Sequence, residues 1–185
     1  MSRLTTRFLP LILCLVPTLA TAQFDTDHPG YFPIEDLGFF PEESINLEIN
    51  LTGPMLKFIA LATDEEEPEL ARLVEELDSI RVRGADLEEI DADRLRTGIR
   101  ETAKRLTDSG WSSMVRIREE DEEVHVFFKE QDGEMMGLTV LSLEDDEAML
   151  INLVGKIDPT TLGSLASGLD LPQLEDAISA SDSND

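Results

Sequence analysis

Hydrophobic and polar residues alternate strictly from residue 45 to residue 51. Every second residue from Ile45 to Leu51 is apolar, and the residues between are asparagine or glutamate. This period of two predicts a β-strand with one buried and one solvated face. After Gly53-Pro54, apolar residues from Met55 to Ala62 recur at helical spacing, and so do those from Leu70 to Leu77. We therefore expect a strand followed by two helical segments.

The rest of the chain continues with a strand, a helix and four more strands. Residues 79–83 form a short alternating stretch, and residues 91–109 carry a helical apolar stripe with acids in the first turn and Gly110 at the end. Four alternating stretches then follow, separated by short acidic turns: 111–118, 123–129, 137–143 and 148–157. Turns this short join antiparallel neighbours, so these four strands predict a meander.

This order of elements predicts an α+β fold, a two-layer sandwich with a mixed, mostly antiparallel sheet of about six strands. Helices bridge the first three strands, and right-handed crossovers would place them on one face and leave the other face open. The domain occupies residues 44–167. An irregular arm rich in aromatic residues, proline and glycine precedes it at 23–43, and the acidic tail at 168–185 has a composition typical of disorder.

The first 22 residues have the pattern of a secretory signal peptide. Arg3 and Arg7 give a positive start, residues 8–19 are apolar, and Ala20-Thr21-Ala22 has the small-x-small form that precedes cleavage. The apolar stretch is shorter than the roughly 20 residues of a spanning helix. We expect an exported protein, periplasmic or secreted, with no transmembrane segment after cleavage.

The position of the single cysteine limits the kinds of site that the mature chain can contain. The only cysteine, Cys14, lies inside the predicted signal peptide, and Leu13 stands where a lipoprotein site needs a small residue. We therefore expect no lipid anchor. The mature chain then has no thiol, which excludes disulfides, iron–sulfur clusters and cysteine nucleophiles.

The charge is strongly acidic. The formal net charge is −25 at pH 7, and removal of Arg3 and Arg7 with the signal peptide makes it −27. Such a chain repels nucleic acid and anionic membrane surfaces, so we expect no nucleic-acid partner. Solubility and salt tolerance would explain this acidity, and the functional alternative is that the acidic residues bind a dedicated cationic ligand.

Two stretches resemble cofactor-binding motifs, but each lacks residues that its motif requires. Gly155-Lys156 could end a phosphate-binding loop, but Leu150 stands where that loop needs glycine and Ile157 where it needs serine or threonine. The stretch DADRLRTGIRET could be a calcium loop, but Arg96 replaces its required glycine and Thr102 its bidentate glutamate. We expect no cofactor.

Catalytic and metal-ligating residues are not indicated either. His28 and His125 have no second histidine or cysteine in a local motif, so neither a zinc site nor a nucleophile–base pair is predicted. The acidic turns would hold divalent cations only loosely, because they fix no geometry.

Five cations share the outer side of the predicted strands. They are Arg81, Arg83, Arg116, Arg118 and Lys129. Cross-strand pairing with Glu48 and Glu123 would explain them, and recognition of a protein or another anionic envelope component is the functional alternative. A second candidate surface is the aromatic arm. Its rings are Tyr31, Phe32, Phe39 and Phe40.

Over residues 44–166 the chain resembles the bacterial domain of unknown function 4252 family. The resemblance depends on the strand INLEINL, the strand SIRVRG, a helix ending in DSGW, and the closing strand with its Gly-Lys-Ile end. It implies a small envelope protein of unassigned function; such proteins are often lipid-anchored and sometimes encoded near sigma and anti-sigma factors. This chain lacks a usable acylation cysteine, and the family supplies no catalytic residues to transfer.

The leading hypothesis is therefore an exported, non-catalytic interaction or accessory module of the cell envelope. The alternative is a hydrolase-like enzyme that uses carboxylates on loops. A basic patch on a flat sheet would favour the first, and a deep pocket with convergent acids the second.

Overall fold

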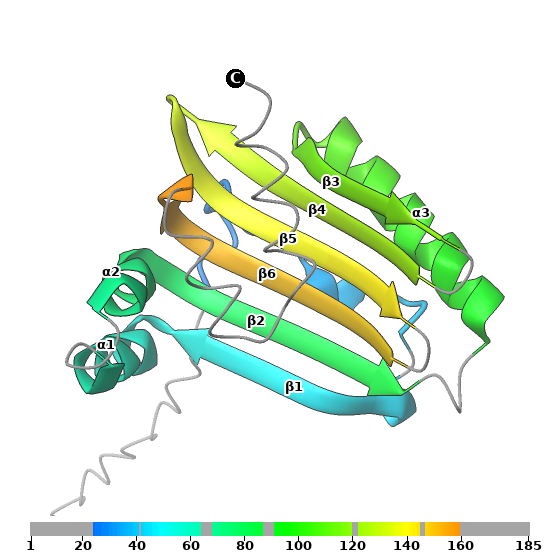
Figure 1. Ribbon diagram of the computed structural model, residues 1–185, viewed down its shortest axis with the longest axis horizontal. Helices are drawn as coiled ribbons and strands as arrows, with labels where there is room; N and C mark the ends of the chain where they lie inside the picture. Colours follow the sequence, from blue (N-terminus) through cyan, green and yellow to red (C-terminus); the bar gives the residue numbers. More distant parts are fainter. Residues whose placement is uncertain are drawn as a thin grey trace, which may run out of the picture.

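The computed structural model describes residues 24–40, 42–63, 68–86, 91–119, 122–144 and 147–159. Its centre is a six-stranded sheet with the order β1-β2-β6-β5-β4-β3 (Figure 1). The strands are β1 (Ile45–Thr52), β2 (Leu77–Asp86), β3 (Ser112–Arg118), β4 (Glu122–Gln131), β5 (Glu134–Glu144) and β6 (Glu147–Ile157). The helices are α1 (Gly53–Thr63), α2 (Pro68–Glu76) and α3 (Ala92–Asp108), with short 3-10 turns at Ile34–Asp36 and Glu42–Ser44.

The predicted α+β sandwich, with six strands and a closing four-strand meander, is confirmed. Strands β3, β4 and β5 each pair with the next strand in the chain. The sheet is wholly antiparallel rather than mixed, since β2 also runs antiparallel to both β1 and β6. The reason lies in the α1–α2 hairpin, which reverses the chain at the end of β1 and returns it along the same edge.

Alternation along the strands produces two apolar clusters, one on each face of the sheet. On the face that we call the first face, Val126, Val140 and Ile151 form a row across β4, β5 and β6. Leu56 of α1 and Leu73 of α2 belong to the same cluster. The apolar stripe predicted for the second segment therefore does face the sheet, whereas in the first segment Leu56 and Ile59 face it and Met55 and Phe58 do not.

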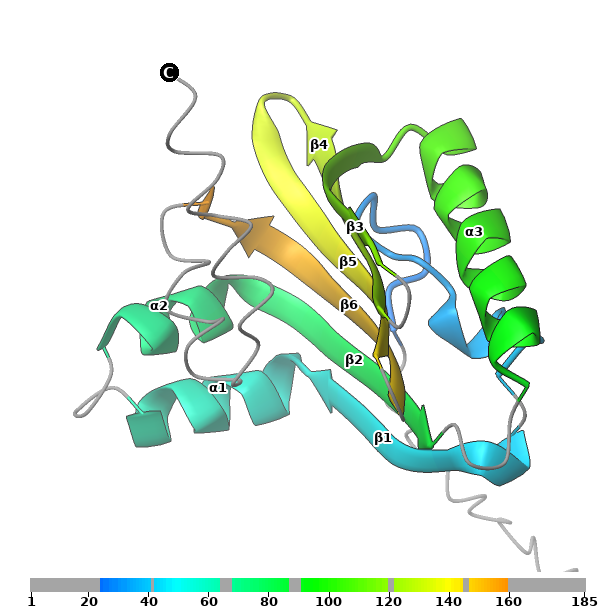
Figure 2. The same cartoon turned by 45° about the vertical axis from the view of Figure 1, so that its right-hand side comes forward.

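The second face carries the other cluster and is covered by α3 and the arm (Figure 2). Phe127 and Leu141 of the sheet pack here with Leu95 and Ile99 of α3. The arm adds four buried side chains to this cluster. They are Phe32, Ile34, Leu37 and Phe40. The sequence predicted that one face of the sheet would stay open. In the structure α3 and the apolar side chains of the arm together cover the second face, so neither face is open.

Two local features of the helices and strands follow from residue type. The sequence placed Asp91 in the first turn of the helix, whereas the structure makes it the N-cap residue. Asp91 caps α3, with Oδ1 accepting from the backbone N–H groups of Asp93 at 2.9 Å and Arg94 at 3.4 Å. Gly155 lies within β6 at φ 133°, opposite Leu77 where the register shifts, so it forms a bulge and no phosphate loop. These positions follow from capping chemistry and from the conformational freedom of glycine.

A pair of glycines brings the arm directly onto the sheet. A Cβ atom at Gly30 would lie 1.9 Å from the carbonyl oxygen of Met136, and one at Gly137 would lie 2.5 Å from the Cα atom of Gly30. Backbone therefore packs on backbone between the arm and β5. Only glycine at both positions permits this approach.

Parts of the sequence predictions concern residues outside those that the structure describes. The signal peptide at 1–22 and the acidic tail at 168–185 both lie there. Among the described residues, no helix has the length and apolar character needed to cross a membrane.

Candidate functional site

The five predicted basic residues do share one face, but they do not form one patch. Strand pairing aligns Arg81 with Asn152, and Arg116 with His125, all on the second face. Strands β6, β5 and β4 separate β2 from β3. Neighbouring strands are about 4.8 Å apart, so the cations of β2 lie roughly 19 Å from those of β3.

Arg81 is not available to a partner, because it is only 1% exposed. Its Nη1 donates to Glu35 at 2.6 Å, and its Nη2 donates to the carbonyl of Phe32 and to Asn152 Oδ1. The guanidinium carbon lies 4.1 Å from the centre of the Tyr31 ring. A planar guanidinium suits this combination of carboxylate, carbonyl and ring. Arg81 therefore holds the arm on the sheet.

Asn152 completes the same buried network from β6. Its side-chain oxygen accepts from the backbone N–H of Phe32 at 3.2 Å, and its Nδ2 donates to the carbonyl of Gly30 at 3.1 Å. Nδ2 also donates to Thr139 Oγ1 at 3.0 Å. Arm backbone groups that lose water on docking are thereby satisfied by the sheet.

The other basic residues with local contacts are Arg83, Arg118 and Lys129. Arg83 lies 3.7 Å from Glu48, and Arg118 lies 3.5 Å from Glu123. Both cross-strand pairs considered from the sequence are thus present. Lys129 donates to the carbonyl oxygens of Ser109 and Gly110 at 2.7 and 3.2 Å, beyond the end of α3. Of the predicted patch, Arg116 and Arg118 are exposed on β3.

A second buried charge network joins α3 to β4. Glu123 is 2% exposed. Arg100 donates hydrogen bonds to its carboxylate, from Nε to Oε1 at 3.1 Å and Oε2 at 3.2 Å, and from Nη2 to Oε2 at 3.0 Å. His125 Nε2 lies 3.1 Å from Glu123 Oε1, and its ring stacks on Phe127. Burial by itself would raise the pKa of Glu123, but hydrogen bonds from Arg100 and His125 outweigh it and lower the pKa.

This network does not have the form of an acid–base site. Both oxygens of Glu123 are taken by Arg100, and His125 is only 2% exposed. A catalytic carboxylate must reach a substrate, so the arrangement joins the helix to the sheet instead. Sequence reasoning missed Arg100 because nothing local marks a pair 23 residues apart across a loop.

The lowered pKa of Glu123 makes acid stability depend on Arg100. A depressed pKa stabilises the fold above the unfolded value of about 4.3, and this stabilisation is lost as pH falls through the folded pKa. Arg100→Gln lets the pKa rise, so we expect acid unfolding to begin at a higher pH. Circular dichroism during acid titration measures this. Lys104→Gln is the control, because its pair with Asp108 is exposed; equal midpoints for both variants would contradict the prediction.

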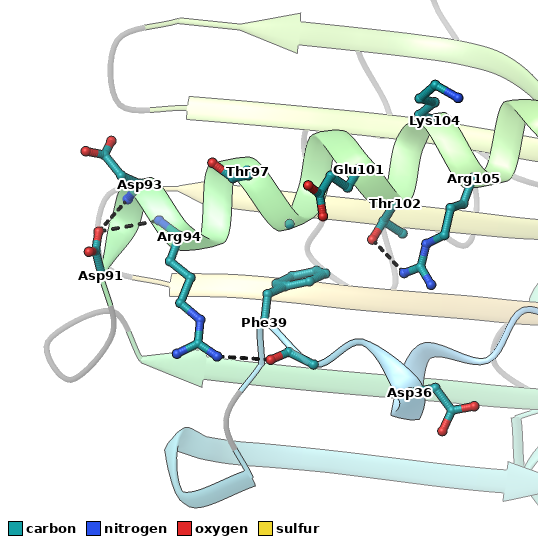
Figure 3. Close-up of a pocket in the computed structure, with 12 residues that line it drawn as sticks. Asp36, Phe39, Asp91, Asp93, Arg94, Thr97, Glu101, Thr102, Lys104 and Arg105 are labelled. Carbon is teal, nitrogen blue, oxygen red and sulfur yellow. Dashed lines mark hydrogen bonds between the residues drawn. The ribbon is translucent and has the colours of Figure 1, made fainter.

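A groove of about 930 Å³ separates the arm from α3 (Figure 3). Phe39 forms one wall and stands on Gly98, where a Cβ atom would lie 2.1 Å from the Phe39 ring. Arg94 reaches across from α3 to the carbonyl of Gly38 at 3.1 Å. Arg105 donates to Thr102 at 3.2 Å.

The charges of this groove do not converge on one point. Acids and bases both line it, and most of them lie on exposed turns of α3. Within the ranges that the structure describes, no group of three or more histidine, cysteine, aspartate or glutamate residues could hold a metal ion. A ligand site requires a few polar groups aimed at one place, so this groove supplies no binding chemistry by itself.

The most unusual surface is an apolar stripe on α1. Met55, Phe58 and Leu61 are 54%, 72% and 78% exposed, and their spacing of three places them along one side of the helix. We call these three residues the α1 stripe. The opposite side of α1 buries Leu56 and Ala60. The stripe was not predicted, because Met55 and Phe58 were counted among the residues at helical apolar spacing and Leu61 was not singled out.

The model of a protein family matches this chain. Its description is "Domain of unknown function (DUF4252)", and its model matches residues 40–165. The chain belongs to this family. No curated protein and no solved structure matches the chain significantly.

The DUF4252 match contains the whole sheet, all three helices and both the Arg100–Glu123 network and the α1 stripe. Most of the arm precedes it. Arg81 and Asn152 therefore lie inside the DUF4252 region, while Tyr31, Phe32 and Glu35 lie before it. The resemblance seen in the sequence is confirmed, and the description attaches no activity to it.

Proposed function

We propose that this DUF4252 protein is an exported, non-catalytic interaction module of the bacterial cell envelope that binds a partner protein through the α1 stripe. The observation that supports this is the exposure of three large apolar side chains on one side of one helix. Single exposed apolar residues are common on protein surfaces, but a contiguous group marks an interaction site.

The geometry of α1 suits a helix-in-groove contact. Anchors at positions 55, 58 and 61 follow the spacing with which an amphipathic helix enters an apolar groove. Full burial of a Phe, Leu or Met side chain contributes about 1.5–3 kcal/mol. Leu56 and Ala60 already fix the helix on the sheet, so the stripe is presented by a preformed element and binding orders little of it.

The charge of the chain favours a basic partner. The net charge is −25 with the predicted signal peptide and −27 without it. Two copies of the protein therefore repel each other, and so do this protein and an anionic surface. A partner with an apolar groove inside a basic surface would be attracted electrostatically and then held by the stripe. Lys57 is the only charged residue of α1, so the groove itself needs little charge complementarity.

Substitution of Phe58→Glu together with Leu61→Glu should weaken partner binding by at least about 100-fold, because two anchors are lost at about 1.5 kcal/mol or more each. A photo-crosslinking residue at position 58 identifies the partner, and affinity for the purified partner is then measured. The melting temperature should stay nearly unchanged, since both side chains are exposed in the free protein.

The control is Arg116→Gln with Arg118→Gln, at the exposed cations of β3. We expect this variant to bind as the unmodified protein does. If it loses binding and the glutamate variant keeps it, recognition of an anionic partner by β3 replaces the present proposal.

Export is tested separately by the intact mass of the protein from its native host. Removal of the signal peptide should give the mass of a chain that begins at Gln23.

A further inference from the structure

Several side chains on the first face of the sheet are more completely buried than the helices packed on that face can explain. Val124 and Val126 on β4 are each 1% exposed, and Val140 on β5 is 8% exposed. The helices of this face are α1 and α2. They lie at one end of the sheet (Figure 1) and pack chiefly on β1, β2 and β6.

Strand register shows how far these valines lie from the helices. Helix α2 joins β2 at Leu77, and Val82 of that strand is aligned with the row that contains Val126 and Val140. Five residues of strand span about 16 Å, and Val124 lies about 7 Å further on. Neighbours within a sheet shield only the sides of a valine. Burial this complete requires atoms above the face.

We propose that the C-terminal segment 160–179 of this chain docks on the first face over β4, β5 and β6. The chain leaves β6 at Ile157, which itself belongs to the cluster of this face. The strands are about 4.8 Å apart, so the segment is several times longer than the distance it must cross.

The composition of the segment fits this face. It contains six large aliphatic residues, which are Leu162, Leu165, Leu169, Leu171, Leu174 and Ile178. The last four of them fall within the tail whose overall composition is typical of disorder. An apolar sheet face and an apolar-rich segment remove each other from water, whereas a second copy would bring a net charge of −25 against another of the same sign.

Photo-crosslinking in the full-length mature chain tests the docking directly. A photo-reactive residue replaces Met149, which lies on β6 among the partly buried residues of the first face. We expect crosslinks within one chain to peptides from 160–179, mapped by mass spectrometry. The matched control is the same residue at position 116, exposed on β3, which should give no such peptides. Crosslinks from position 149 to a second copy or another protein would overturn the proposal.

Truncation gives an independent readout. A chain that ends at Pro159 should melt on the order of 10 °C lower, because the three valines lose their cover, and should bind an apolar dye that the full chain does not. A synthetic peptide of residues 160–179 should reverse both effects. Truncation after Ser179 is the control and should change neither. An unchanged melting temperature in the Pro159 truncation, without dye binding, would show that the segment does not cover this face.

Discussion

Arg81→Ala is expected to lower the free energy of unfolding by about 3 kcal/mol, because the buried guanidinium satisfies two interior acceptors and the loss of such a hydrogen bond costs about 1–3 kcal/mol. The substitution removes the guanidinium donor from the carbonyl of Phe32 and leaves Asn152 Oδ1 with only the backbone N–H of Phe32, and it frees Glu35 from its ion pair. It also removes the cation on which the Tyr31 ring rests. Urea unfolding followed by circular dichroism measures the change.

The arm should respond first in this variant. Because Arg81 and Asn152 together hold residues 30–32, limited proteolysis within 24–40 should become faster before the sheet unfolds. Arg116→Ala is the control, since Arg116 is exposed, and should stay within about 0.5 kcal/mol of the unmodified protein. Equal stability of the two variants would mean that the arm is held mainly by its aromatic side chains.

Trp111→Ala is the second large effect that we expect, at about 3–5 kcal/mol. Trp111 is 5% exposed and belongs to the cluster of the second face. Its ring meets Phe32 edge to face, with the centres 6.3 Å apart, so the substitution opens a cavity between the sheet, α3 and the arm.

An aromatic residue of the α1 stripe supplies the matched control for this substitution. Phe58→Ala also removes a whole ring, but Phe58 is 72% exposed. It should change the free energy of unfolding by no more than about 0.5 kcal/mol. Thermal unfolding of both variants separates burial from residue type. A cost below about 1 kcal/mol for Trp111→Ala would contradict its place in the core.

The sequence by itself determined the elements and the faces on which their residues lie. The alternation from Ile45 to Leu51, the helical stripe of residues 91–109 and the short acidic turns predicted β1, α3 and the meander, and all are present. It also placed Arg81, Arg83 and Arg116 on a common face. These properties depend on period, capping and turn length, which involve residues within a few positions of each other.

Long-range packing decided the rest of the sheet. The insertion of β6 between β2 and β5 joins residues about 70 apart, such as Arg81 and Asn152, and no local pattern encodes that partner. The arm has no periodicity, so its position over the second face could not be anticipated. A short pattern states that a side is apolar, but it does not state which distant segment will cover it.

The candidate sites show the same division in more detail. The alternation of its strand predicted that Arg81 would be solvated. It can be buried because Glu35, 46 residues away, balances its charge and the carbonyl of Phe32, 49 residues away, accepts one of its hydrogen bonds. The helical spacing of Met55 and Phe58 predicted buried positions, but these residues and Leu61 are exposed because Leu56 and Ala60 use the side of α1 that meets the sheet. Residue type fixes the energetic cost of exposure or burial, whereas the tertiary structure decides which side chains have a partner.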